Sequence, residues 1–218
     1  MNRGQVDARP LEPTAAQREL LHALQHGLEL LYRLDPSPAV TDFLLAPTHA
    51  VARGEQLWVV QGDDLQLGLA LDPLALTALT VRQLAIDNLQ QFCLVVEGVS
   101  HFLFLMHRAR HDQCTSALEL ELQSEVDKYV AALMLARRHA ELPSHRLRQR
   151  LYAHYRLLSD LSPDERDRYH SANRMAQRYA RRLEQRFVRQ RQVPAMLREL
   201  RLFYRMPCWA KHAHIHQD

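Results

Sequence analysis

Cysteine and glycine are scarce in this chain of 218 residues, and both scarcities exclude classes of protein. The three cysteines, Cys93, Cys114 and Cys208, are far apart and odd in number, which argues against a disulfide framework and against a cysteine-based zinc site. Six glycines are too few to suggest a loop that cradles a phosphate. A disulfide-rich domain and a nucleotide-binding enzyme are therefore not expected.

The sequence also lacks a long uninterrupted apolar run. The longest, from Phe92 to Met106, is broken by Glu97, Ser100 and His101 and is shorter than the roughly 20 residues that span a bilayer. The N-terminus has neither the apolar stretch of a secretory signal nor the composition of a transit peptide. We expect this run to be a core helix in a cytoplasmic protein with no membrane partner.

Charge is unevenly distributed along the chain although the formal net charge is only +3. Residues 1–136 contain 17 Asp and Glu against 9 Lys and Arg, whereas residues 137–218 contain 8 against 19. Lys128 and Lys211 are the only lysines, a bias that a GC-rich genome alone would produce. We predict an α+β domain over residues 1–136 and, packed on it, an Arg-rich helical extension over residues 137–218, whose charge makes a polyanion partner worth testing.

The pattern of apolar residues, caps and breakers predicts an α+β fold that is predominantly helical, with a small N-terminal antiparallel sheet followed by a helical bundle. Three segments have strand character, namely residues 40–46, 56–61 and 65–71. The predicted helices cover residues 15–34, a segment beginning near 74, 81–110, 116–138, 144–158, 163–190 and 194–204.

Two titratable residues lie inside the most apolar of these helices. Glu97 and His101 are four positions apart, so they lie within about 40° of each other on the helix surface and can address one point. Apolar residues occupy every side of this helix, which indicates burial all round. A carboxylate buried there without a partner would be costly, and a partner is therefore expected.

The next helix offers that partner. Glu125 falls within its inward apolar stripe, and Glu121 lies one turn earlier at the edge of that stripe. Glu97, His101 and Glu125 could then converge on one divalent metal ion, with zinc, iron or manganese suited to a histidine and two carboxylates. The alternative is a cluster of Glu, His and Lys or Arg that is held by hydrogen bonds without a metal.

The sequence around these residues resembles the ImmA/IrrE-like zinc peptidases, in which a helix ending in HExxH is followed by a second acidic helix. The segment from Glu125 to Leu133 resembles that second helix. The resemblance implies that Glu97 replaces the first zinc-binding histidine, that His101 is the second ligand and that Glu125 is the third. Gly98 stands where the family has the glutamate that activates water, so efficient peptidase activity is not expected.

Two further groups of residues suggest binding. His107 and His111 are four residues apart and could bind a metal, but they end the buried helix, where C-terminal capping by a protonated imidazole is expected. The tail containing His212, His214 and His216 is expected to fray, although it would bind nickel or zinc adventitiously. Arginines crowd the predicted helix over residues 163–190 and could contact phosphates, although such a face is usually solvated or paired internally. The candidate polyanion-binding residues are Arg174, Arg178, Arg181 and Arg182.

Three functions are consistent with these features. We favour a degenerate zincin-like protein that binds one divalent metal and acts, with an unknown protein partner, as a regulatory or interaction module. The first alternative is a helical nucleic-acid-associated or scaffolding protein in which Glu97 and His101 only hold the core together. The second is an active metal-dependent hydrolase that uses another base, for which Glu121 is the candidate.

Overall fold

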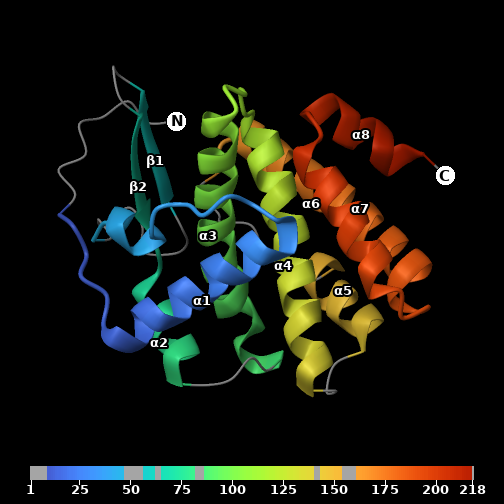
Figure 1. Ribbon diagram of the computed structural model, residues 1–218, viewed down its shortest axis with the longest axis horizontal. Helices are drawn as coiled ribbons and strands as arrows, with labels where there is room; N and C mark the ends of the chain where they lie inside the picture. Colours follow the sequence, from blue (N-terminus) through green and yellow to red (C-terminus); the bar gives the residue numbers. More distant parts are fainter. Residues whose placement is uncertain are drawn as a thin grey trace.

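The computed structural model describes residues 9–46, 56–61, 65–81, 86–139, 143–153 and 161–217. Within these ranges the chain is predominantly helical (Figure 1). The helices are α1 (Ala15–Tyr32), α2 (Pro73–Val81), α3 (Leu89–Arg110), α4 (Ala117–His139), α5 (Ser144–Ala153), α6 (Pro163–Leu183), α7 (Val193–Arg205) and α8 (Cys208–His216). Short helical turns are η1 (Val40–Phe43), η3 (Ile86–Asn88) and the π-helical η4 (Glu184–Val188), and the strands are β1 (Gln56–Gln61) and β2 (Leu65–Ala70).

Helices α3 and α4 pack side by side at the centre of the molecule (Figure 1). α1 and α2 contact α3, and α6 packs along α4. One apolar core joins these elements and contains residues from both the acidic and the basic part of the chain, from Leu21 to Ile215. Because neighbouring elements cover α3 and α4, many of the polar residues of these two helices are buried, including His101 and Glu121.

Strands β1 and β2 form a two-stranded antiparallel hairpin, with a register running from Gln56 opposite Ala70 to Gln61 opposite Leu65. The prediction of a strand over residues 40–46 is wrong. This segment begins with the turn η1 and then makes only isolated bridges. The Gln25 side chain accepts a hydrogen bond from the Val40 backbone N–H at 2.8 Å, which fixes the segment to α1 instead of to a ladder. The predicted three-segment sheet is therefore not confirmed.

Two predicted helix starts, at residues 15 and 163, are confirmed and each follows a capping box. A capping box at Thr14 begins α1, and another at Ser162, with Pro163 in the first turn, begins α6. The helix expected over residues 81–110 begins only at Leu89, after the turn η3, and ends at Arg110 as predicted; residues 82–85 of that prediction lie outside the described part of the chain. The helix expected over residues 163–190 changes at Leu183 into the π-helical turn η4.

The histidine-containing tail was expected to fray, but it forms an ordered helix. Residues 208–216 form α8, and Lys211 and Ile215 on one of its faces are buried. His212 and His216 lie on the exposed side with their rings stacked 4.4 Å apart. The tail is thus a structural element whose buried face contributes to the core.

Among the described helices, α3 alone is long and apolar enough to cross a membrane by length and composition. In this structure 61% of its most apolar window is buried against the rest of the protein. Such burial is typical of a core helix, which agrees with the packing of α3 against α1, α2 and α4.

Candidate metal centre

Helices α3 and α4 bring together Glu97, His101 and Glu121. One ligand atom from each residue lies within 4.8 Å of the corresponding atoms of the other two. His101 Nε2 and Glu121 Oε2 are 3.7 Å apart, and the side chains of both residues are more than nine-tenths buried. The cluster therefore presents one imidazole nitrogen and two carboxylate oxygens around a common point.

Glu125, predicted as the third metal ligand, is not the residue that the structure brings to this point. Its carboxylate accepts a hydrogen bond from Lys128 Nζ at 2.6 Å, and the same ammonium donates to Glu97 Oε2 at 3.2 Å. Because α3 and α4 are antiparallel, residues one turn earlier on α4 face residues later on α3. His101 accordingly lies beside Glu121, while Glu97 lies beside Lys128.

Lys128 links the two carboxylates electrostatically. Burial raises the pKa of Glu125, and the nearby Glu97 raises it further, while Lys128 opposes the rise. Burial lowers the pKa of Lys128, but the attraction of Glu125 and Glu97 outweighs it and holds the pKa well above its ordinary value. At neutral pH Lys128 is therefore a buried ammonium shared between two glutamates. The sequence offered, as an alternative to a metal site, a cluster of charged residues held by hydrogen bonds. Lys128, Glu97 and Glu125 form such a cluster.

The donor set suits a borderline divalent cation. Tetrahedral coordination at about 2.1 Å places neighbouring ligand atoms about 3.4 Å apart. The 3.7 Å between His101 Nε2 and Glu121 Oε2 is close to that separation, and the other pairs of ligand atoms, which lie within 4.8 Å, need to approach by at most about 1.4 Å. Histidine with two carboxylates fits zinc, iron or manganese.

A second buried polar network on the other side of α3 and α4 was missed by the sequence analysis. Its centre is Asp127, which accepts hydrogen bonds from Ser100 Oγ at 2.6 Å, from Gln123 Nε2 at 2.9 Å and from the Tyr32 hydroxyl. Burial raises the pKa of Asp127 to about 6, and these three hydrogen bonds limit the rise. The network joins α1, α3 and α4 through fully buried groups.

Lys211 extends this network to α8. Its ammonium donates to Gln123 Oε1 at 2.9 Å and lies 4.4 Å from the centre of the Phe104 ring. Burial lowers the pKa of Lys211 to about 7, although Glu119 at 3.8 Å opposes the fall. Glu119 also pairs with Arg108, whose guanidinium donates to the Met206 carbonyl at 2.9 Å. Lys128 on α4 and Lys211 on α8, the two lysines of the chain, are thus both buried, and no pattern in the sequence indicated the role of Lys211.

The other candidate residues lie away from the cluster. Burial, followed by the neighbouring His111, lowers the pKa of His107 to about 4, so the protonated cap expected at His107 is wrong. The carbonyl of His107 instead lies 2.8 Å from His111 Nδ1. Arg174, Arg178 and Arg181 are exposed on α6, and Arg182 is partly buried beside α8.

Comparisons with protein-family models, with curated proteins and with solved structures found no match for this chain. The resemblance to zinc peptidases consequently rests on the sequence around Glu97, His101 and Glu125 alone.

Proposed function

We propose that this protein binds one divalent metal ion through Glu97, His101 and Glu121 and acts as a regulatory or interaction module. The convergence of the three ligand atoms within 4.8 Å carries this proposal. Zinc, iron and manganese are the candidate metals, because one imidazole and two carboxylates suit all three. The residues come from two adjacent buried helices, so a bound ion would tie α3 to α4 and add its binding free energy to the stability of the fold.

The proposal modifies the zincin-like assignment. Glu121 takes the third ligand position in place of Glu125, and Lys128 holds Glu125 and Glu97. Gly98 follows Glu97 on α3 and offers no side chain to accept a proton from water. A residue that ligates the metal cannot also serve as an independent base, which weakens the hydrolase alternative based on Glu121. This proposal includes the zincin-like assignment, the α+β description with a small N-terminal sheet, a cytoplasmic location and an unknown protein partner.

Metal analysis of ligand variants tests the proposal. The chain should be purified without a metal-affinity step, with His212→Ala and His216→Ala to remove the exposed histidine pair, and then equilibrated with zinc or manganese. We expect about one metal ion per chain, retained after extensive dialysis. His101→Ala and Glu121→Gln should each weaken binding by at least about tenfold.

Glu125→Gln is the matched control, because Glu125 lies one turn from Glu121 on the same helix and makes a salt bridge to Lys128. It should leave metal affinity within about threefold of the parent, a difference of under about 0.7 kcal/mol. Less than about a tenth of a metal ion per chain, unchanged by either ligand variant, would show that the glutamates and His101 have a structural role only. Loss of metal with Glu125→Gln but not with Glu121→Gln would return the third ligand to Glu125.

A further inference from the structure

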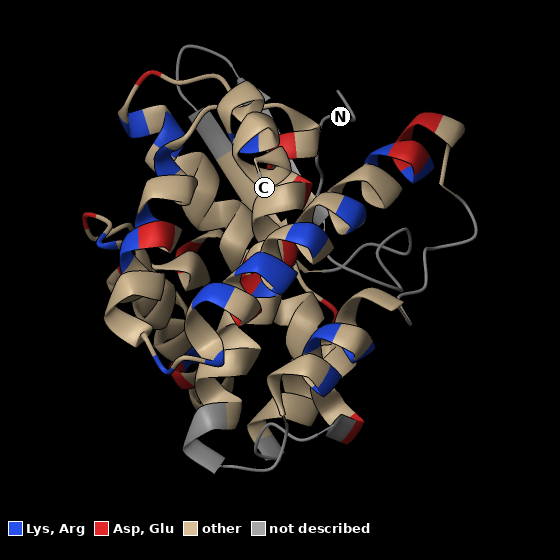
Figure 2. Cartoon of the chain, turned by 90° about the vertical axis from the view of Figure 1, so that its right-hand side faces the viewer, with Lys and Arg blue, Asp and Glu red and all other residues tan. Residues whose placement is uncertain are grey.

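An arginine-lined hollow lies on the surface between α6, η4 and α8. Its volume is about 430 Å³, and the residues that line it are Arg178, Arg181, Arg182, Gln185, Arg186, Ile215, His216 and Gln217. Four of these eight side chains are guanidinium groups and none is a carboxylate. The face of the molecule around the C-terminus shows the corresponding row of Lys and Arg segments (Figure 2).

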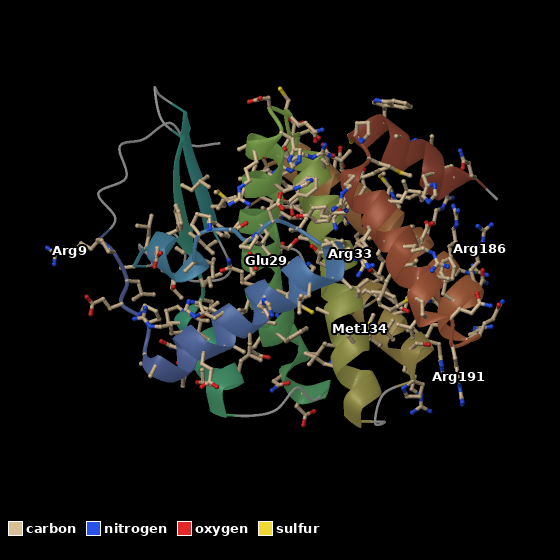
Figure 3. The ribbon with its side chains drawn as sticks, in the orientation of Figure 1. Arg9, Glu29, Arg33, Met134, Arg186 and Arg191 are labelled. Carbon is tan, nitrogen blue, oxygen red and sulfur yellow. The ribbon has the colours of Figure 1, made fainter. Side chains whose placement is uncertain are left out.

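The spacing of the arginines explains why they share this hollow. Arg178, Arg182 and Arg186 are four residues apart in sequence, so they follow one side of α6 and of the π-helical turn η4 that continues it. The side chain of Arg186 projects at the outer edge of the molecule (Figure 3). A π-helical turn within a helix often accompanies a functional site, and here the turn forms one wall of the hollow.

Arg182 is fixed in place by α8. Its Nη1 donates to the His214 carbonyl at 2.5 Å and to the Gln217 carbonyl at 3.4 Å, at the C-terminal end of that helix. Its buried Nε has no hydrogen-bond partner among the described residues. The contact holds one guanidinium in a set orientation, which reduces the entropy lost when an oxyanion binds beside it.

Glu184, the acidic residue of η4, does not neutralise the arginines of the hollow. Glu184 is buried, and its carboxylate accepts hydrogen bonds from Arg148 Nε at 2.8 Å and from Ser144 Oγ at 3.0 Å, both from α5. Within the described part of the chain, Arg178, Arg181 and Arg186 make no ion pair with a carboxylate. Several positive charges therefore converge on a concave surface, where they repel one another and raise the local potential for anions.

We propose that this hollow binds a compact anion with several phosphate groups, such as an inorganic polyphosphate or the polyphosphate part of a nucleotide. Guanidinium groups bind phosphate oxygens through paired hydrogen bonds, and four of them match a ligand with more than one phosphate better than a single monovalent anion. The lining contains no Phe, Tyr or Trp on which a nucleobase could stack, so recognition is directed to the phosphates. This inference does not depend on the metal site.

Calorimetric titration with tripolyphosphate at about 50 mM salt tests the inference. Arg178→Gln combined with Arg186→Gln should weaken binding by at least about tenfold, because both guanidinium groups line the hollow. Arg166→Gln combined with Arg174→Gln is the matched control, since both residues are exposed on α6 and the change in net charge is the same. Arg174, a candidate from the sequence, lies outside the lining of the hollow and is therefore not part of the proposed site. The control should stay within about threefold of the parent chain.

Three results would overturn the inference. Absence of tripolyphosphate binding at millimolar concentration would show that the hollow does not bind an anion of this kind. Equal weakening by both double variants would show diffuse charge attraction instead of a site. Single-stranded DNA that binds more tightly than tripolyphosphate, and that loses affinity equally in both double variants, would identify an extended nucleic-acid surface along α6. Unchanged circular dichroism in all variants verifies that the comparison concerns folded protein.

Discussion

Lys211 shows at the scale of one residue how a buried charge affects stability. The ammonium lies in the core beside Gln123 and Phe104, and burial lowers its pKa to about 7. In the unfolded chain the same group titrates near its ordinary value of 10.5. Between these two pH values the unfolded state binds more protons than the folded state. This group therefore makes the free energy of unfolding increase as pH rises above 7, by at most about 1.4 kcal/mol per pH unit.

Replacing Lys211 with Met should remove that contribution. Urea unfolding of both proteins at pH 7.0 and at pH 8.5 measures it, since this window lies within the range over which Lys211 titrates differently in the two states. We expect the wild-type chain to gain stability relative to Lys211→Met on going from the lower to the higher pH. An identical pH dependence in the two proteins would contradict the lowered pKa.

At the scale of elements, the N-terminal cap determines where α6 begins. Ser162 Oγ accepts a hydrogen bond from the Glu165 backbone N–H at 3.3 Å, and the Glu165 carboxylate accepts one from the Ser162 backbone N–H at 2.9 Å. The helix then runs about five turns to the arginine-lined hollow and packs along α4 on the way. Its start was predictable because Ser, Pro and Glu stand at the positions that a capping box requires.

Ser162→Ala should lower the free energy of unfolding by about 1 kcal/mol, because one hydrogen-bond acceptor for the first turn is lost. Chemical unfolding measures this effect. Ser171→Ala on the same helix is the control and should cost less, since Ser171 lies inside α6, beyond its first turn. Metal and tripolyphosphate binding should be unchanged, because the cap lies at the opposite end of α6 from the hollow. An equal loss in both variants would show that the cap itself does not stabilise the helix.

At the scale of the whole molecule, the sequence predicted what depends on local spacing and missed what depends on how helices are placed. A separation of four was sufficient to put Glu97 and His101 on one face of α3. That spacing could not distinguish Glu121 from Glu125 as the third ligand, because these two residues are also four apart. The distinction depends on the axial position of α4 relative to α3. In the structure Lys128 forms a salt bridge with Glu125, and Glu121 is the residue that lies beside His101.

The network around Asp127 was missed for a related reason. Its members come from four helices, and Lys211 meets Gln123 across a sequence separation of 88 residues. The apolar stripe on α4 indicated one inward side only, whereas Gln123 and Asp127, which lie outside that stripe, are also buried by protein. α8 was missed with it, because the reason for its order is the burial of Lys211 and Ile215 against distant residues.

Anomalous diffraction at the zinc edge, on crystals of the His212→Ala and His216→Ala protein equilibrated with zinc, tests the central claim most directly. We predict one strong anomalous peak between α3 and α4, about 2.0–2.3 Å from His101 Nε2 and from a Glu121 carboxylate oxygen. Glu97 should complete the protein ligands, and Glu125 should remain with Lys128. Well-ordered His101 and Glu121 side chains without anomalous density between them, at saturating zinc, would contradict the account and leave the cluster a structural part of the core.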